Sequence, residues 1–412
     1  MRYGAGRCSL QPAVSSENQA MTSSLPSLLD VGLFTERREH ESFDLYRAQS
    51  EPPHHIGPEP DEGFYVLTRH AHVWEAATNT EKFKSGLGTQ IANKRAEGSG
   101  APSVHNADAR YHRHLRDFGR RALAQPLLDI RRPRIREIVR SVILAAPRNE
   151  EFDFVERVAL EIPMTIFGEV LGIPAGDRET LVKAANTMSS VLATPEEQDR
   201  CRLELFSYFR ELAAERRRQP GDDVASILVS PNDNGEQLSD EELDAYFLLL
   251  VIAGNETTRF LLAGGLEQLL LQPDAMQRLR KESSLIPSAV EEMIRWVTPV
   301  IHMRRTVTED TQAFGLNVAA GSKFVLYFSA ANRDPEVFER PHSFRVDRTP
   351  NKHVGFGAGH HFCMGAYLAR LEAQIFLEEF LSITRDCELA ADGERIPSFW
   401  FAGLQRLPVR WS

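Results

Sequence analysis

One stretch of this 412-residue chain is too long and too apolar to lie on the surface of a small protein. It runs from Leu238 to Pro273, and its start carries a capping box in which Glu242 follows Ser239 by three residues. A helix that is apolar on nearly every face normally crosses the middle of a large domain. The polar insert Asn-Glu-Thr-Thr at 255–258 is out of place in such a core and marks a position to explain.

Amphipathic helical patterns dominate the rest of the chain, and strand signals are short and few. Strands are predicted at 64–68 and 323–329, and a hairpin-like pattern covers 398–411. No internal repeat or low-complexity linker divides the chain. The sequence therefore predicts a mainly α fold with small β-sheets, forming one domain over 21–412 after a disordered extension at 1–20.

The charge balance and the cysteines exclude several classes of protein. Lys and Arg number 48 against 58 Asp and Glu, a net charge of -10, whereas a nucleic-acid binder usually shows the opposite balance. The four cysteines show no CxxC pairing, so a disulfide framework is not expected and a reducing compartment fits. The longest apolar run, Ala245–Gly254, falls short of the roughly 20 residues of a membrane span. We expect a soluble, cytoplasmic protein with no membrane span and no nucleic-acid partner.

The stretch 356–365, Phe-Gly-Ala-Gly-His-His-Phe-Cys-Met-Gly, holds one cysteine among glycines. Such glycines let the backbone lie against a flat ligand. A helix predicted to begin near Gly365 directs its dipole and free N–H groups at Cys363, and both effects favour the thiolate. The interpretation of His360, His361 and Cys363 as a zinc site is weak, because three ligands within four positions cannot all face one tetrahedral centre. The residues alone leave open a redox thiol, a buried small hydrophobe, or a thiolate aimed at a larger metal cofactor.

The polar insert of the long helix forms a second candidate site. Gly254 weakens the helical ladder, and the Thr257 hydroxyl can compete for a freed carbonyl, which would open a groove in mid-helix. With Glu256 beside it, an acid and an alcohol in an apolar wall can relay protons. A helix bend that leaves Glu256 solvated on a far face is the alternative explanation.

Charged residues at helical spacing supply two further candidates. Glu292 and Arg295 stand three apart and can pair on one helical face, which taken alone is an ordinary salt bridge. His112 and Arg116 stand four apart and share a face, and Arg305 lies in a separate segment. Basic donors from distant segments suit the carboxylates of a bound cofactor. The alternative is a solvated basic face, which is favoured for the neighbours Arg113, Arg120 and Arg121.

These signals occur together and in one order, and in this the chain resembles the cytochrome P450 family of haem-thiolate monooxygenases. The stretch 356–365 matches that family's cysteine loop, Phe-Gly-x-Gly-x-His-x-Cys-x-Gly, without a departure. AGNETT at 253–258 is similar to its oxygen-binding helix signature, and EMIR at 292–295 to its Glu-x-x-Arg. ANRDP at 331–335 and LARLE at 368–372 extend the resemblance over most of the chain.

The resemblance implies a haem b group between the long helix and the helix after the cysteine loop, with Cys363 as axial thiolate of the iron. Phe356 would shield the sulfur, and backbone N–H groups around Met364 and Gly365 would tune its potential. The remaining implied contacts are Gly357 and Gly254 at the haem, and His112, Arg116, Arg305 and His361 at its propionates.

Catalytic and structural roles follow from the same resemblance. Thr257 and Glu256 would deliver protons to dioxygen, whereas Glu292 and Arg295 would hold the core beneath the cysteine loop. The family often supplies a further Arg to that last pair. Ser343 stands where that Arg is expected, so the partner is left open between Arg345 and Arg348.

The resemblance also places an apolar substrate pocket, lined by Val251, Ile252, Val300, Ile301, His302, Phe399 and Trp400. The loop 83–106 and the region 187–194 would complete it. An apolar pocket with one or two polar anchors fits a terpenoid, a steroid or a fatty-acid derivative. His302 either contacts the substrate or satisfies a local backbone group. Lys94 and Arg95 either attract a substrate carboxylate or are simply solvated.

The implied activity is insertion of one oxygen atom from O2 into a hydrophobic small molecule. The chain has no convincing flavin or nicotinamide fingerprint, so the electrons would come from a ferredoxin-type donor with its reductase. The Arg cluster around His112 is a candidate docking patch for an acidic partner. Two alternatives stay open: the same haem fold in a non-hydroxylating oxidation or coupling of secondary metabolism, and a non-catalytic haem-binding recruitment protein.

Overall fold

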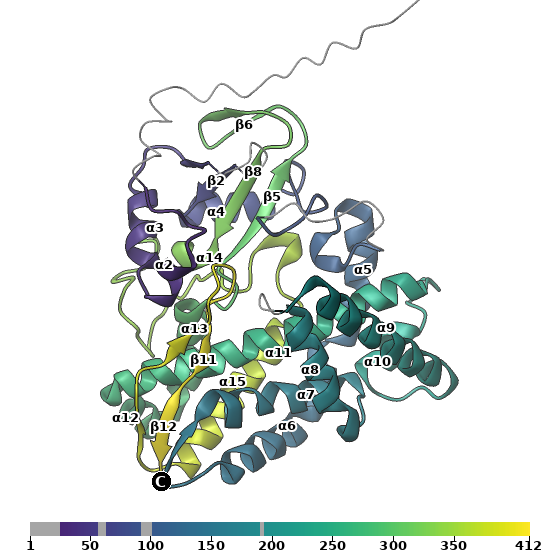
Figure 1. Cartoon of the computed structure of the whole chain (residues 1–412), viewed down its shortest axis with the longest axis vertical. Helices are drawn as coiled ribbons and strands as arrows, with labels where there is room; N and C mark the ends of the chain where they lie inside the picture. The colour runs from purple at the N-terminus through teal and green to yellow at the C-terminus, as the bar shows by residue number, and fades with distance from the viewer. Residues whose placement is uncertain (1–24, 57–62, 92–100, 190–192) are drawn as a thin grey trace, which may run out of the picture.

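The long apolar stretch forms one continuous helix through the centre of the molecule (Figure 1). The computed structural model describes residues 25–56, 63–91, 101–189 and 193–412. Helix α11 (Asp240–Leu271) begins after Ser239, whose hydroxyl accepts from the Glu242 N–H at 3.2 Å while the Glu242 carboxylate accepts from the Ser239 N–H at 2.8 Å. The next helix, α12 (Pro273–Lys281), starts at the predicted proline. The predicted capping box and both ends of the helix are confirmed.

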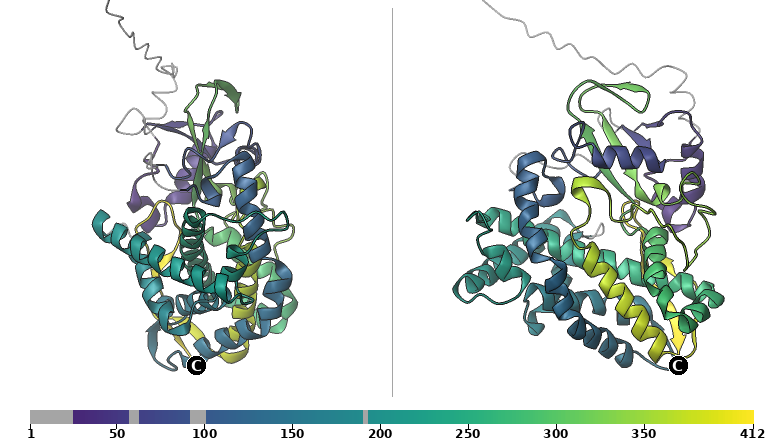
Figure 2. Two further views of the ribbon diagram at one scale, coloured as in Figure 1. Left: turned by 90° about the vertical axis from the view of Figure 1, so that its right-hand side faces the viewer. Right: turned by 180° about the vertical axis from the view of Figure 1, so that it is seen from behind.

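Helices surround α11, and together they form the larger part of the molecule (Figure 2). Helix α11 packs against α7, α8, α9, α13 and α15, and α15 packs in turn against α6. The bounds of these helices are α5 (Ala109–Ala122), α6 (Gln125–Ala145), α7 (Glu161–Leu171), α8 (Arg178–Ser189), α9 (Pro195–Arg218), α10 (Val224–Val229), α13 (Ile286–Val297) and α15 (Ala366–Ile383). The predicted mainly α fold is confirmed, and α15 follows the cysteine loop with Gly365 as its N-cap.

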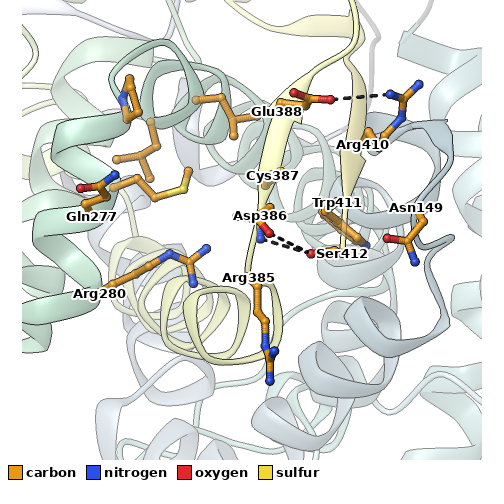
Figure 3. Close-up of a pocket in the computed structure, with 14 residues that line it drawn as sticks. Asn149, Gln277, Arg280, Arg385, Asp386, Cys387, Glu388, Arg410, Trp411 and Ser412 are labelled. Carbon is orange, nitrogen blue, oxygen red and sulfur yellow. Dashed lines mark hydrogen bonds and ion pairs between the residues drawn. The ribbon is translucent and has the colours of Figure 1, made fainter.

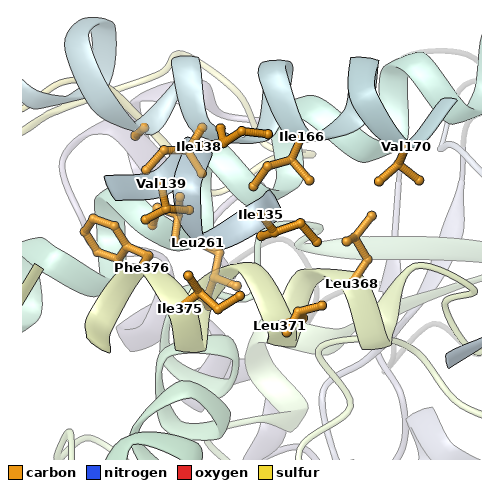
Figure 4. Packing of buried hydrophobic residues seen from close by; sticks show 14 of the residues in the cluster. Ile135, Ile138, Val139, Ile166, Val170, Leu261, Leu368, Leu371, Ile375 and Phe376 are labelled. Atoms are coloured by element: carbon orange, nitrogen blue, oxygen red, sulfur yellow. The ribbon is translucent and has the colours of Figure 1, made fainter. Parts of the chain in front are cut away.

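Side chains from four helices fill the centre of this helical part (Figure 4). Ile135 of α6, Ile166 of α7, Leu261 of α11 and Ile375 of α15 are all at most 3% exposed. Each such side chain contributes about 1.5–3 kcal/mol when it is fully removed from water. The core therefore fixes the position of α11 relative to α15, which are the two helices expected to enclose the cofactor.

By length and composition, α11 could also cross a membrane. Within the described residues it is instead enclosed by other helices, and five of its polar side chains are buried: Asp244, Asn255, Thr258, Glu267 and Gln268. Asp244 is paired with Arg210 of α9. Buried polar groups with protein partners are expected in the core of a globular domain and are unfavourable against lipid. Helix α11 is therefore a core helix of this fold.

A five-stranded sheet forms the second, smaller part of the molecule (Figure 1). Its strand order is β1 (His54–His55), β2 (Phe64–Leu67), β8 (Lys323–Tyr327), β5 (His302–Val307) and β3 (Phe83–Lys84). Strands β2 and β8 are parallel, and the other pairs are antiparallel. The short helices near it are α2 (Val31–Thr35), α3 (Glu39–Arg47), α4 (His70–Thr78) and α14 (Phe328–Ala331). Both predicted strands are confirmed, although Phe328 and Ser329 begin α14 instead of extending β8.

The predicted C-terminal hairpin is wrong. Strand β11 (Leu404–Arg406) pairs with β10 (Glu394–Arg395), whereas β12 (Pro408–Trp411) lies between β4 (Glu151–Asp153) and β9 (Cys387–Leu389). One residue, Leu407, separates β11 from β12 and is fully buried, and a tight hairpin needs two turn residues. The remaining pair is the small hairpin of β6 (Thr311–Ala313) and β7 (Leu316–Val318).

The two long loops expected near the substrate are only partly described. The loop 83–106 contains β3 and a short 3-10 turn at Val104–Asn106, and residues 92–100, with Lys94 and Arg95, lie outside the described residues. Residues up to Ser189 of the region 187–194 belong to α8, and 190–192 lie outside. The proposed disordered extension at 1–20 also lies outside the described residues.

Candidate functional site

The cysteine loop is a tight turn held against α4 and α15. The Cys363 N–H donates to the Phe356 carbonyl at 2.9 Å, and Gly357 and Gly359 have positive φ angles of 71° and 67°. A Cβ at Gly359 would lie 2.8 Å from the carbonyl oxygen of Ala77, so this position accepts only glycine. The glycines therefore fold the loop back on itself and present Cys363 just before the first turn of α15.

Cys363 is exposed, yet it lies deep enough in the fold for burial to raise the pKa of its thiol. Hydrogen bonds from the backbone N–H groups of Gly365 and Ala366 and the charge of Arg116 act in the opposite direction. The predicted contributions favouring the thiolate are therefore present, but in the protein alone burial outweighs them. A bound metal ion deprotonates a coordinating thiol regardless. At Gly365 an added Cβ would lie 3.9 Å from the sulfur, so the backbone approaches it closely.

The Phe356 ring lies beside the cysteine loop, and the Arg370 guanidinium carbon is 4.6 Å from its centroid. Arg370 is in turn bound by Glu291 through two contacts of 2.7 and 2.8 Å. The His353 ring contacts the same carboxylate at 3.0 Å. These contacts leave the Phe356 ring fixed between α15 and the turn that carries Cys363.

The four basic residues predicted to bind propionates lie close together. The rings of His112 and His361 are 4.2 Å apart, and Arg116 donates to the Phe362 carbonyl at 2.5 Å. Arg305 is 3% exposed and donates to the Arg304 carbonyl at 2.9 Å. The cluster thus joins α5, the cysteine loop and β5, three segments that are far apart in the sequence.

Burial keeps the imidazoles of this cluster neutral. Burial first, and then neighbouring positive charges, lower the pKa of His112 to about 4 and that of His361 to about 2. His112 Nε2 and Arg305 Nε are buried without a hydrogen-bond partner. Buried polar atoms of this kind normally have partners. Unpaired polar atoms of basic side chains near an exposed cysteine could bind the carboxylates of a haem. The residues present therefore match that cofactor.

Glu256 and Thr257 follow the predicted Gly254 by two and three residues on an unbroken α11. The Thr257 hydroxyl donates to the Ala253 carbonyl at 2.7 Å, as predicted for a competing hydroxyl, but the helix is continuous, so no break opens a groove here. The Glu256 side chain is only 14% exposed, which contradicts the solvated alternative. A Cβ at Gly254 would lie 2.8 Å from the Phe167 ring of α7, and this packing contact accounts for the glycine.

Two of the three predicted substrate-pocket segments are joined to each other. Val300 forms an isolated β-bridge with Phe401, and the Ile301 N–H donates to the Trp400 carbonyl at 2.9 Å. The Phe399 ring is stacked on His302 at 6.3 Å. On the third segment, Val251 is buried in the helical core and Ile252 is half-buried.

His302 fits neither of its two sequence-based interpretations within the described residues. It is 1% exposed, and neither ring nitrogen has a hydrogen-bond partner, so no local backbone group is satisfied by it. Its ring instead packs between Tyr327, at 5.1 Å, and Phe399. Burial lowers the pKa of His302 to about 3, so the imidazole is neutral at physiological pH.

Glu292 is fully buried and lies at the centre of a hydrogen-bond network. Its carboxylate accepts from Arg295 at 2.7 and 2.8 Å, and from the Arg348 Nε–H at 2.9 Å. The Arg345 backbone N–H and the Asn351 amide complete the set at 2.7 and 3.2 Å. The open question of the third partner is therefore answered by Arg348, because the Arg345 side chain pairs with Glu339 and Asp347 instead.

Some residues of this region carried no signal in the sequence. Asp108 precedes α5, where an acidic residue is normally an N-cap, but its carboxylate accepts from the N–H groups of Ser85 and Gly86 at 2.9 and 2.6 Å. The Ser85 hydroxyl lies 3.2 Å from His361 Nε2. These contacts join the start of the loop 83–106 to the basic cluster, and no motif marks them because the partners are more than twenty residues apart.

A separate pocket of about 520 Å³ lies between α12, β9 and β12 (Figure 3). None of the predicted cofactor or substrate residues lines it. Its charges are largely satisfied: Arg280 donates to the carbonyls of Leu381 and Thr384, and Glu388 lies 3.7 Å from Arg410. We therefore place the chemistry at Cys363 and not in this pocket.

The Glu292 network predicts different costs for two neighbouring arginines. Replacing Arg348 with Ala removes one cation from a fully buried carboxylate, so we expect a loss of about 3–5 kcal/mol in the free energy of unfolding. Replacing Arg345 with Ala leaves its backbone N–H in place and removes partly exposed ion pairs, which costs about 1 kcal/mol or less. Urea unfolding of both variants measures the difference. Equal losses would show that Arg348 is not the third partner.

The buried His302 predicts a specific response to acid. Its pKa is about 3 in the folded protein, below the ordinary value, so the unfolded chain takes up the proton first and stability falls as the pH drops below about 6.5. Replacing His302 with Phe removes this term, and the loss of stability between pH 7.5 and 5 should shrink by about 2 kcal/mol. Urea unfolding at both pH values provides the measurement. An unchanged pH dependence would mean that His302 is not held neutral in the fold.

Comparison with known proteins agrees with this geometry. The chain matches the family model described as Cytochrome P450 over residues 61–385. It is 32% identical over 411 residues to a steroid C26-monooxygenase of Mycolicibacterium smegmatis, with 95% of each chain covered. The crystal structure of CYP108D1 from Novosphingobium aromaticivorans gives a TM-score of 0.86 at 31% identity, over 98% of this chain and 100% of that one.

A further solved structure extends the agreement. CYP109E1 from Bacillus megaterium, in complex with corticosterone, gives a TM-score of 0.81 at 30% identity, over 91% of this chain and 99% of that one. A family match over most of the chain and relatives of this identity and coverage are sufficient to assign a family. The chain belongs to the cytochrome P450 family, and it is a monooxygenase whose cofactor is haem bound through a cysteine thiolate.

Proposed function

We propose that this P450 oxidises a steroid or a similarly sized hydrophobic molecule, and that the thiolate of Cys363 would hold the haem iron. The observation that carries the proposal is the exposed residue Cys363 in a glycine turn, with its sulfur faced by the N–H groups of Gly365 and Ala366. A sulfur that receives backbone hydrogen bonds has its potential set by the protein. When bound, the haem supplies the activation of O2.

The basic cluster orients the cofactor in this proposal. His112, Arg116, Arg305 and His361 would hold the two propionates, because His112 Nε2 and Arg305 Nε need acceptors that the described protein does not provide. Binding of carboxylates there raises the pKa of both imidazoles relative to the protein alone. Phe356, Gly357 and Gly365 belong to the cysteine loop, and they fix the turn around the Cys363 sulfur.

The residues of α11 would handle protons. Thr257 keeps its hydroxyl hydrogen on the Ala253 carbonyl, which leaves the oxygen lone pairs free to accept. Burial raises the pKa of Glu256, so its carboxyl is protonated closer to neutral pH than that of an exposed glutamate and has a proton to donate there. We therefore assign Glu256 to proton supply and Thr257 to its placement.

The steroid assignment rests on relatives and on the apolar character of the substrate side. The relatives include steroid C26-monooxygenases, and CYP109E1 has been crystallised with corticosterone and with testosterone. In this chain the half-buried side chains of Val300, Phe399 and Trp400 are mostly apolar, and Ile301 and the neutral His302 are buried beside them. An apolar wall with few polar groups suits a rigid hydrophobic substrate. A soluble, cytoplasmic, single-domain enzyme is part of the same proposal.

Haem binding and substrate class can be tested together. In the purified enzyme, carbon monoxide with dithionite should give the red-shifted Soret band of thiolate ligation, and Cys363→Ala should abolish it. Cholestenone, a steroid that keeps its side chain, should produce a spin-state shift in a spectral titration, as should testosterone. A retained thiolate band in Cys363→Ala would overturn the ligand assignment. A shift with fatty acids but with neither steroid would overturn the substrate class.

The electron donor is proposed to be a ferredoxin-type protein that docks on α5. Arg113, Arg116 and Arg120 share one face of this helix, and Arg116 donates to the Phe362 carbonyl beside Cys363. Arg113 and Arg120 are exposed. A positive patch on an acidic protein attracts an acidic partner. Electrons delivered at this face therefore have a short path to the cysteine loop.

Charge reversal on α5 should slow reduction of the haem. With Arg113 and Arg120 both replaced by Glu, we expect the rate with a ferredoxin and its reductase to fall by about tenfold or more at low salt. The matched control replaces Arg200 and Arg218 of α9, which are also exposed, with Glu, so that the net charge is the same. Stopped-flow reduction measures both. Equal rates in the two double variants would remove the docking proposal.

A further inference from the structure

Glu256 has a charged neighbour on its own helix that the motif does not include. Arg259 stands one turn further along α11, and its NH2 nitrogen lies 3.6 Å from Glu256 Oε1. The two side chains are 16% and 14% exposed. The distance is longer than a direct hydrogen bond, so the carboxylate is paired but not locked in one geometry.

Arg259 is held in place by packing. Its guanidinium carbon lies 4.7 Å from the centroid of the Phe260 ring, and its Nε is buried without a hydrogen-bond partner. The Phe260 ring packs against the C-terminal segment. A Cβ added at Gly403 would lie 2.0 Å from this ring, and the centroids of the Phe260 and Phe401 rings are 5.9 Å apart. The arginine is therefore fixed by the same segment that borders the substrate side.

Arg259 is also the charge that acts on Glu256 in the described part of the chain. Burial raises the pKa of Glu256, and the positive charge of Arg259 opposes that rise. Burial in turn lowers the pKa of Arg259, and Glu256 opposes this. Among the described residues of α7, α8, α9, α13, α15 and the C-terminal segment, no other charged side chain acts on this carboxyl. Near Glu256 on α11, Gly254 contacts Phe167 of α7, and Phe260 contacts Phe401 and Gly403 of the C-terminal segment, all of which are uncharged.

We infer that Arg259 is a positioning residue that holds the Glu256 carboxylate as a loose ion pair in the apolar wall of α11, so that it can accept a proton from water and release it toward Thr257. This inference rests on the proposed role of Glu256. In each cycle water gives one proton to the carboxylate and the carboxyl passes one on, so its charge is restored. Without Arg259 the buried carboxyl would stay protonated at higher pH, and the relay would stop in its neutral form.

The test compares three variants of the whole enzyme: Arg259→Leu, Arg259→Lys, and the control Arg202→Leu. Like Arg259, Arg202 of α9 pairs with an acid three residues before it, and its NH2 nitrogen lies 2.8 Å from Asp199 Oδ1. Its guanidinium carbon also lies over an aromatic ring, 5.9 Å from the centroid of Phe206. Infrared titration, taken as the difference between each protein and its Glu256→Gln counterpart, reports protonation of Glu256 without turnover. We expect Arg259→Leu to raise the midpoint by about 1–3 pH units. Arg259→Lys should restore it, and Arg202→Leu should leave it unchanged.

Turnover supplies the second readout. The pH profile of product formed from cholestenone per electron consumed should shift in Arg259→Leu by the same amount as the infrared midpoint. Arg259→Gln replaces the Leu variant if the latter yields too little folded enzyme. An unshifted midpoint, or a shift that Lys does not restore, overturns the inference while leaving the role of Glu256 intact. A Glu256→Gln enzyme with unchanged product yield at every pH overturns the proposed role of Glu256 itself.

Discussion

The buried carboxylate of Glu292 is the interaction on which the cysteine loop depends. Arg295, held by Glu292, also donates to the carbonyls of Asn332 and Pro341 at 2.8 and 2.9 Å. The Asn332 side chain then accepts from the Val354 N–H at 2.7 Å, two residues before the loop begins. One carboxylate thus connects α13 to the turn that presents Cys363. A buried ion pair contributes little net stability, and its value lies in fixing one arrangement of segments that are otherwise irregular.

Sequence patterns were sufficient for the elements whose signals are local. The capping box at Ser239 and Glu242, the proline at the start of α12 and the apolar runs at β2 and β8 each act over a few residues, and each has formed as expected. The C-terminal hairpin was wrong because strand pairing depends on distant partners: β12 finds β4, more than 250 residues away in the chain. Periodicity identifies a strand but does not name its neighbour.

The functional site shows the same difference between local signals and distant contacts. The types of residue at Cys363, Glu292 and Thr257 could be recognised from motifs, but their surroundings could not. The direction in which the pKa of Cys363 is shifted depends on how deeply the loop is buried. The effect of burial outweighs that of the helix N-terminus, which the sequence does predict. Arg348 was left open and Asp108 was missed, because each acts through a side-chain contact with a residue far away in the chain. Arg259 was also missed, although it stands three residues after Glu256, because no motif includes it. Gly254 matched a motif, yet the contact that explains it is the ring of Phe167.

Buried polar side chains among the described residues differ in whether their donors and acceptors have partners. Both oxygens of Glu292 are engaged, and none of its side-chain atoms lacks a partner. By contrast, His112 Nε2, Arg305 Nε and Arg259 Nε are buried and unpaired. An unpaired buried donor costs free energy, so each one calls for an explanation. In the proposed function the first two would meet the carboxylates of the cofactor, and the third lies beside an acid that we propose must stay free to exchange a proton.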